Sequence, residues 1–66
     1  MGASEIMKYF SYDHLPEGPG RNASQQIYSL AMQMEETLEP GAEKSAGLRK
    51  LLEAKDCFVR AALVGA

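Results

Sequence analysis

The sequence predicts an all-α fold: an antiparallel two-helix hairpin that follows a non-helical N-terminal arm. Three observations support this prediction. Two long segments carry apolar residues at helical spacing, the short break EPG at residues 39–41 separates them, and prolines and glycines crowd the arm. A three-residue break between two amphipathic segments is typical of an αα-hairpin.

The arm covers residues 1–21 and contains two prolines and three glycines. Its stretch from Pro16 to Gly20 should interrupt any helix, because proline removes a backbone donor and glycine favours turns. We therefore expect the arm to be mostly non-helical. We also expect Phe10 to be buried against the hairpin, because a core this small leaves an apolar side open that the arm can cover.

Helix one is predicted over about residues 23–38. Asn22 can cap its N-terminus, and Gln25 at the third helical position can bond back to it in a loose capping box. Its apolar residues fall on one face and should form half of the hairpin core. This stripe consists of Ile27, Leu30, Ala31, Met34 and Leu38.

Helix two is predicted over about residues 42–63, ending near Gly65. It carries an apolar stripe that matches helix one, and a set of small residues on another face. That set would let a second helix approach closely, unless its alanines only raise helix propensity. The stripe is Leu48, Leu51, Leu52, Phe58, Val59, Ala62 and Leu63, and the small-residue set is Ala54, Cys57, Ala61 and Val64.

The length of 66 residues predicts one domain that assembles as a symmetric homo-oligomer. Chains below roughly 70–80 residues seldom bury enough apolar surface to be stable alone. One cysteine cannot form an internal disulfide, and one histidine with one cysteine cannot supply a structural zinc site. Association with other copies is therefore the expected source of the additional buried apolar surface.

The charge balance argues against duplex nucleic acid as a partner, because seven Lys and Arg face nine Asp and Glu for a net charge of -2. A smaller anion in a local basic pocket stays compatible with this balance. The sequence has no apolar run of the length of a signal peptide or a membrane span. We therefore expect a cytoplasmic protein without membrane contact.

Lys55 interrupts the apolar stripe of helix two. Either its stem packs while the ammonium reaches solvent, or it lies where hairpins meet around a polar cavity. In a symmetric oligomer, Lys55 with Arg49 and Arg60 would become a ring of positive charge that holds phosphates. The alternative is that these basic residues form a solvated face and pair with the interleaved acidic residues.

The arm carries aromatic side chains and an imidazole in the stretch YFSYDH at residues 9–14. Such rings can stack on a base, and a tyrosine hydroxyl can reach a phosphate. The alternative is that the aromatic residues only cover the hairpin. We expect both, with Tyr12 and His14 available to a ligand.

Catalysis is not expected from this sequence. No motif combines a nucleophile, a base and an orienting group, and two helices offer little room for a cleft that excludes water. We therefore predict neither an enzyme nor a cofactor or metal requirement.

The segments FSYDHLP, QQIYSLAMQM, EPG and EKSAGLRKLLEAKDCFVRAAL together resemble the small phage helical-hairpin proteins grouped with the anti-CBASS and anti-Thoeris sponges. The resemblance covers roughly residues 9–63. Characterised members of that family are hairpins that form symmetric oligomers, often hexamers. They capture cyclic nucleotide signals of bacterial immune systems without cleaving them. The resemblance therefore implies a phage protein that acts in the cytoplasm of an infected bacterial host.

Four arm residues match the family's entry motif, namely Phe10, Tyr12, His14 and Pro16. The chain departs from the family at Tyr28, where relatives often place an arginine. A phosphate contact must therefore come from Arg21, from helix two or from a neighbouring subunit.

The leading hypothesis is a sponge that withholds a cyclic di- or trinucleotide, or a cyclic ADP-ribose-like signal, from a host effector. The alternative is a structural or interaction protein, a helical oligomer that docks on another protein. The candidate ligand-binding residues are Tyr12, His14, Arg49, Lys55 and Arg60.

Overall fold

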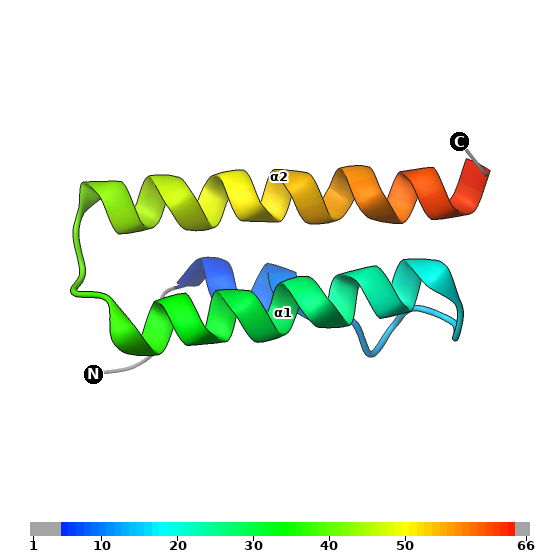
Figure 1. The fold of residues 1–66 in the computed structure, drawn as a ribbon, viewed down its shortest axis with the longest axis horizontal. Helices are drawn as coiled ribbons and strands as arrows, with labels where there is room; N and C mark the ends of the chain where they lie inside the picture. Colours follow the sequence, from blue (N-terminus) through cyan, green and yellow to red (C-terminus); the bar gives the residue numbers. More distant parts are fainter. Residues whose placement is uncertain (1–4, 65–66) are drawn as a thin grey trace.

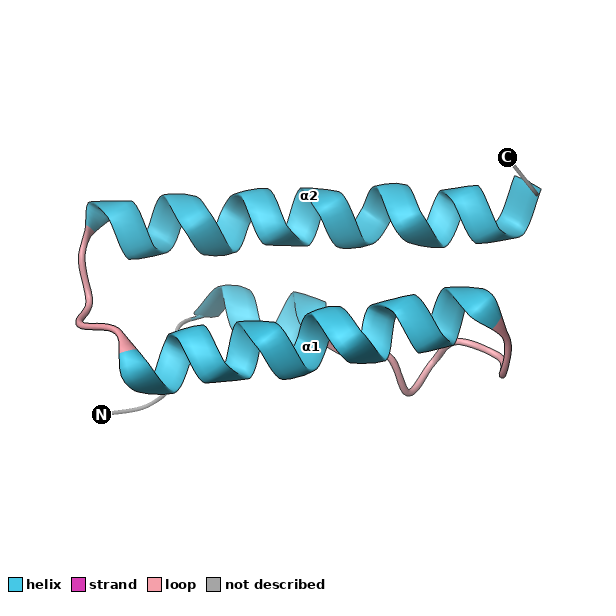
Figure 2. Ribbon diagram, viewed as in Figure 1, coloured by secondary structure: helices cyan, strands magenta, loops and turns pink. Residues whose placement is uncertain are grey.

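The computed structural model describes residues 5–64, which fold entirely from helices and connecting segments. A 3₁₀ helix, η1, spans Glu5–Phe10, and two long α-helices follow, α1 over Pro19–Thr37 and α2 over Ala42–Val64. The two long helices lie side by side and run in opposite directions, whereas the arm with η1 lies against one face of the pair (Figures 1 and 2). The predicted all-α class and hairpin packing are confirmed.

The first long helix begins four residues before the predicted start, at Pro19. The prediction that Asn22 caps it was wrong, because the Asn22 N–H donates to the Gly18 carbonyl at 2.9 Å and so lies inside the helix. Gly18 is the residue before the helix and has a φ of 142°, which favours glycine. Pro19 then starts the helix, because the first helical position needs no N–H donor.

The arm contains more helix than predicted. The residues Glu5–Phe10 form η1, and they place two apolar side chains on the hairpin. Met7 is 8% exposed and Phe10 is fully buried, which confirms the expectation for Phe10. A 3₁₀ turn brings side chains at i and i+3 to the same side, so Met7 and Phe10 point together toward the core.

The core lies where η1, α1 and α2 meet. Its buried hydrophobic residues are Met7, Phe10, Ala31 and Leu48, and half-buried side chains such as Ile27 and Leu52 pack around them. The predicted stripes are therefore correct at their centres and wrong at their edges. The exposed members of those stripes are Leu30, Leu38, Phe58 and Leu63.

The connection between the long helices is fixed by Lys44. Its Nζ donates to the backbone carbonyls of Glu35 at 2.9 Å and of Leu38 at 3.0 Å, and it pairs with the Glu35 carboxylate at 3.1 Å. The last carbonyls of a helix have no partner within the helix. Lys44 therefore closes α1 from the first turn of α2.

Candidate ligand-binding site

Lys55 is buried within a single chain. The residue is 7% exposed, and its Nζ donates to the backbone carbonyl of Tyr9 at 2.8 Å. The Asp56 carboxylate lies 4.0 Å from the same nitrogen. Of the two alternatives for Lys55, the one in which the ammonium reaches solvent does not fit the single chain, since Lys55 uses its ammonium to hold η1 against α2. Whether it also faces a second subunit stays a prediction.

Tyr12 lies where the arm turns toward α1. Its ring packs edge-on against the ring of Tyr28, with 5.6 Å between centroids and 64° between planes. The guanidinium of Arg21 lies 5.7 Å from the centroid of the same Tyr12 ring. An aromatic ring and a permanent cation thus lie together near the start of α1.

The cavity beside these groups has a volume of about 460 Å³, and we refer to it as the entry cleft. It is a surface cleft at the N-terminal end of α1. No side chain caps this end of α1, and because Pro19 carries no N–H, the N–H groups of Gly20 and Arg21 are the first ones without a partner inside the helix. The Glu17 carboxylate also borders the cleft and favours ligands that bring hydrogen-bond donors. The lining residues are Tyr12, Glu17, Gly18, Arg21, Asn22 and Gln25.

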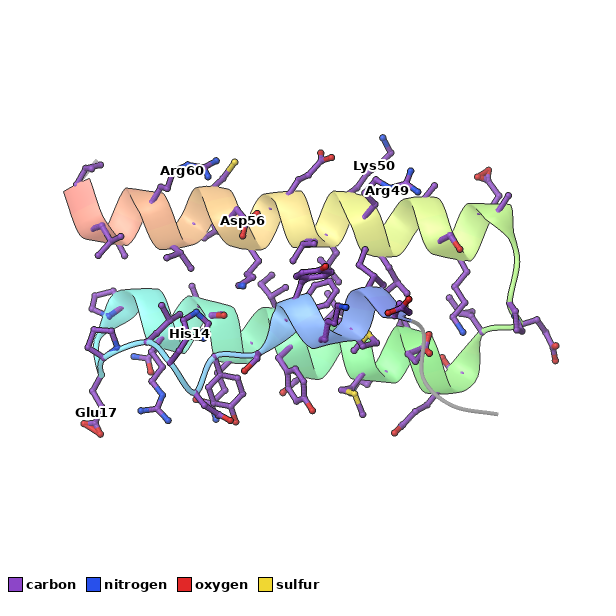
Figure 3. All side chains as sticks on the ribbon, turned by 180° about the vertical axis from the view of Figure 1, so that it is seen from behind. His14, Glu17, Arg49, Lys50, Asp56 and Arg60 are labelled. Atoms are coloured by element: carbon purple, nitrogen blue, oxygen red, sulfur yellow. The ribbon has the colours of Figure 1, made fainter. Side chains whose placement is uncertain are left out.

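His14 borders a second, smaller cavity of about 190 Å³ between the arm and α2, which we refer to as the His14 cavity. His14 is exposed, and Arg60 and Lys55 line the same cavity. Figure 3 shows His14 at the end of the molecule where Arg60 lies, with Asp56 between Arg60 and the middle of α2. Three of the five predicted ligand residues therefore meet at one place.

Arg49 does not join that group. It lies toward the other end of α2, on the side that faces away from α1 (Figure 3), whereas its neighbour Lys50 borders a groove between α1 and α2. Both residues are exposed. In a single chain, the predicted residues are thus divided among the entry cleft with Tyr12, the His14 cavity with His14, Lys55 and Arg60, and the outer face of α2 with Arg49.

The face of the hairpin opposite the arm is open. An apolar groove of about 440 Å³ runs between α1 and α2 there, and we refer to it as the open groove. Of the predicted small-residue set, Ala54 lines this groove, whereas Cys57 is exposed and Val64 is 74% exposed. Packing of the small-residue set against a second helix stays a prediction. The apolar lining includes Leu30, Met34, Leu38, Leu51 and Ala54.

Arg21 is a candidate site residue that the sequence prediction left out of its main set. The sequence indicated Arg21 only as one possible source of a phosphate contact. Its importance depends on the early start of α1, which places residue 21 in the first turn and beside the Tyr12 ring. A helix starting at residue 23 would have left Arg21 in a flexible connection.

Comparison with known proteins gives no relative: no family model matches the chain, and no significant match was found among curated proteins or solved structures. Within residues 5–64, neither long helix combines the length and the apolar character that a membrane span requires.

Proposed function

We propose that this protein is a binding protein for cyclic nucleotide signals, and that it withholds such a signal from a host effector without cleaving it. In this proposal it is a phage protein that acts in an infected bacterial cell as a symmetric homo-oligomer. The ligand is a cyclic di- or trinucleotide or a cyclic ADP-ribose-like molecule, which combines aromatic bases with phosphates.

One observation carries the proposal: the Arg21 guanidinium and the Tyr12 ring lie together at the uncapped start of α1. A base can stack on an aromatic ring, whereas a phosphate is attracted by a guanidinium and by free N–H groups at a helix N-terminus. The entry cleft, at about 460 Å³, has the volume of ordinary small-molecule sites. Both parts of the proposed ligand thus find a complementary group in one cleft.

The remaining residues have secondary roles in this proposal. His14 and Arg60 provide a second polar contact region at the same end of the hairpin. Lys55 acts as a positioning residue, because its bond to the Tyr9 carbonyl holds the arm that carries Tyr12 and His14. Arg49 contributes only through a neighbouring subunit, since it lies on the outer face of α2 (Figure 3).

The experiment is thermal melting of the protein with a panel of cyclic dinucleotides, cyclic trinucleotides and cyclic ADP-ribose isomers. A ligand at a hundred times its dissociation constant stabilises the folded state by about 2.7 kcal/mol, so a binder raises the melting temperature. The ligand is then released by denaturation and analysed by mass spectrometry. Recovery of the intact ligand is expected, whereas no shift with any member of the panel contradicts the proposal.

The open groove favours a second candidate function, that of an interaction protein without a nucleotide ligand. The groove is apolar, and exposed residues such as Leu30 and Leu38 border it. Contiguous apolar surface of this kind marks interaction sites. A protein that binds no panel member and associates through the groove would have this function.

A further inference from the structure

The open groove presents a regular pattern of small and large side chains along α2. Gly47, Leu51 and Ala54 line the groove, and Phe58, which is 52% exposed, continues the row. Successive members, ending at Ala61, are spaced four, three, four and three residues apart. This is the spacing of a heptad repeat, in which a helix packs along a second helix. We refer to these five residues as the α2 seam.

Small and large residues alternate strictly along the α2 seam. Gly47, Ala54 and Ala61 occupy one heptad position, while Leu51 and Phe58 occupy the other. In an antiparallel helix pair, each residue of one position lies opposite a residue of the other position. Each contact between two seam residues then combines one small with one large residue, which fills space without overpacking.

The register of such a pair follows from the same residues. If Ala54 of one copy lies opposite Leu51 of the other, then Gly47 lies opposite Phe58. The same register brings Ala42 level with Leu63 along the helix axes, so the two α2 helices overlap along almost their whole length, and it brings Ala61 level with Lys44. Because the pair is symmetric, every contact occurs twice about a two-fold axis, and the helix dipoles oppose each other favourably.

The exposed area supports a second copy as the occupant. The chain exposes 4740 Å², whereas a compact monomer of 7.2 kDa exposes about 4100 Å². The excess of roughly 600 Å² compares with about 800 Å² per partner in a standard interface. A second hairpin on this face would also cover Leu30 and Leu38 of α1, which are 42% and 48% exposed.

From these observations we infer that two copies of this chain pair antiparallel through the α2 seam and form a four-helix bundle around the open groove. The arm lies on the opposite face of each hairpin, so the entry cleft stays accessible in the dimer (Figures 1 and 3). The pairing does not rest on the proposed function, because it uses no residue of the entry cleft. A dimer that binds no nucleotide would leave this inference standing.

The first test compares Ala54→Arg with Ser45→Arg by sedimentation equilibrium. Both variants add one positive charge to α2, and the two positions, nine residues apart, lie on opposite faces of the helix. Ala54→Arg buries a guanidinium at the seam in both copies, so the dimer dissociation constant should rise by about 100-fold or more. Ser45 is exposed, so Ser45→Arg should leave the dimer intact. Circular dichroism checks that both variants stay helical.

The second test measures the register and does not alter the seam. Nitroxide labels are placed singly at Glu43→Cys or Glu53→Cys in a chain that also carries Cys57→Ser. Residue 53 lies near the proposed two-fold axis, whereas the residues at position 43 are separated by about 30 Å along the helices. Dipolar spectroscopy should therefore give a short distance for position 53 and a long one for position 43.

Three outcomes would overturn the inference. One is a parent protein that stays monomeric at about 100 μM, a concentration at which even a weak dimer with a micromolar dissociation constant forms. Another is an equal response of the dimer to Ala54→Arg and Ser45→Arg. The third is a short distance between labels at position 43, which would indicate parallel helices.

Discussion

At the scale of single residues, Lys55 shows how a short chain uses a charged group in its interior. The surrounding stripe is apolar, and the ammonium would be costly to bury without a partner. The structure gives it the Tyr9 carbonyl at 2.8 Å, at the end of η1, where backbone carbonyls lack helical partners. The lysine therefore links two segments that are 46 residues apart and keeps the arm in place.

Replacing Lys55 with methionine tests this role. Methionine keeps most of the apolar stem and removes the ammonium, so η1 loses its bond to α2. A hydrogen bond from a charged donor is worth about 1.5–3 kcal/mol. Amide hydrogen exchange at Met7 and Phe10 should accelerate by roughly tenfold or more, while exchange in the middle of α1 changes little.

The control is Arg49→Met, since Arg49 is exposed on the same helix and points away from α1 (Figure 3). It should leave exchange in η1 unchanged. Equal exchange rates in η1 for Lys55→Met and the parent protein would show that the ammonium does not hold the arm.

Ser24 gives a second prediction at this scale. The residue is fully buried in α1, and its Oγ has no hydrogen-bond partner among the described residues. Ser24→Ala removes an unpaired hydroxyl and also raises helix propensity, so it should stabilise the fold by about 1–2 kcal/mol. The control Ser29→Ala lies at an exposed position of the same helix and gains only the propensity, about 0.5 kcal/mol. Urea denaturation that finds Ser24→Ala less stable than the parent would contradict this account.

At the scale of elements, the sequence predicted the type and order of both long helices. It placed the end of α1 and both ends of α2 to within one residue, but it misplaced the start of α1. Helical periodicity is read from many residues at once, so uncertainty about single positions did not hide either apolar stripe. Two residues could mark the start of α1, namely Asn22 as a cap and Pro19 as the first helical residue. The structure uses Pro19 and the positive φ of Gly18, and a search for a polar cap overlooks this pair.

The short helix η1 was missed for a different reason. Its six residues are too few to show a helical period, and the nearby prolines and glycines favoured a non-helical arm. The prediction of the candidate site was limited in the same way, because it also depended on local structure that the sequence pattern did not show. The sequence identified Tyr12 and His14 from their chemistry, but the pairing of Tyr12 with Arg21 depends on where α1 begins.

Lys44 provides the prediction at the scale of elements. It satisfies two carbonyls at the end of α1 and pairs with the half-buried Glu35, so Lys44→Met should lower the free energy of unfolding by about 1–3 kcal/mol. The control Arg49→Met, at an exposed position of the same helix, should change it by less than about 0.5 kcal/mol. Urea denaturation should be run at one protein concentration, because association also contributes to stability. Equal losses for the two variants would contradict the capping role.

At the scale of the whole molecule, the two faces of the hairpin differ in structure. The arm covers one face (Figure 1) and brings aromatic and basic groups to the start of α1. The opposite face carries the apolar open groove. The sequence indicated association through small residues of α2. It placed Leu30 and Phe58 in the core, however, because periodicity alone does not show how wide a stripe two helices can cover.

The most direct test of the proposed function is amide chemical-shift mapping of the ¹⁵N-labelled protein with each member of the cyclic nucleotide panel. The proposal predicts that a binding member shifts the amides of residues 12–14, 18 and 20–22, around the entry cleft, with a smaller effect at Arg60. Arg21→Met should abolish these shifts, and Arg49→Met should leave most of them in place. The proposal would be contradicted by an unchanged spectrum with every panel member, or by shifts confined to residues of the open groove.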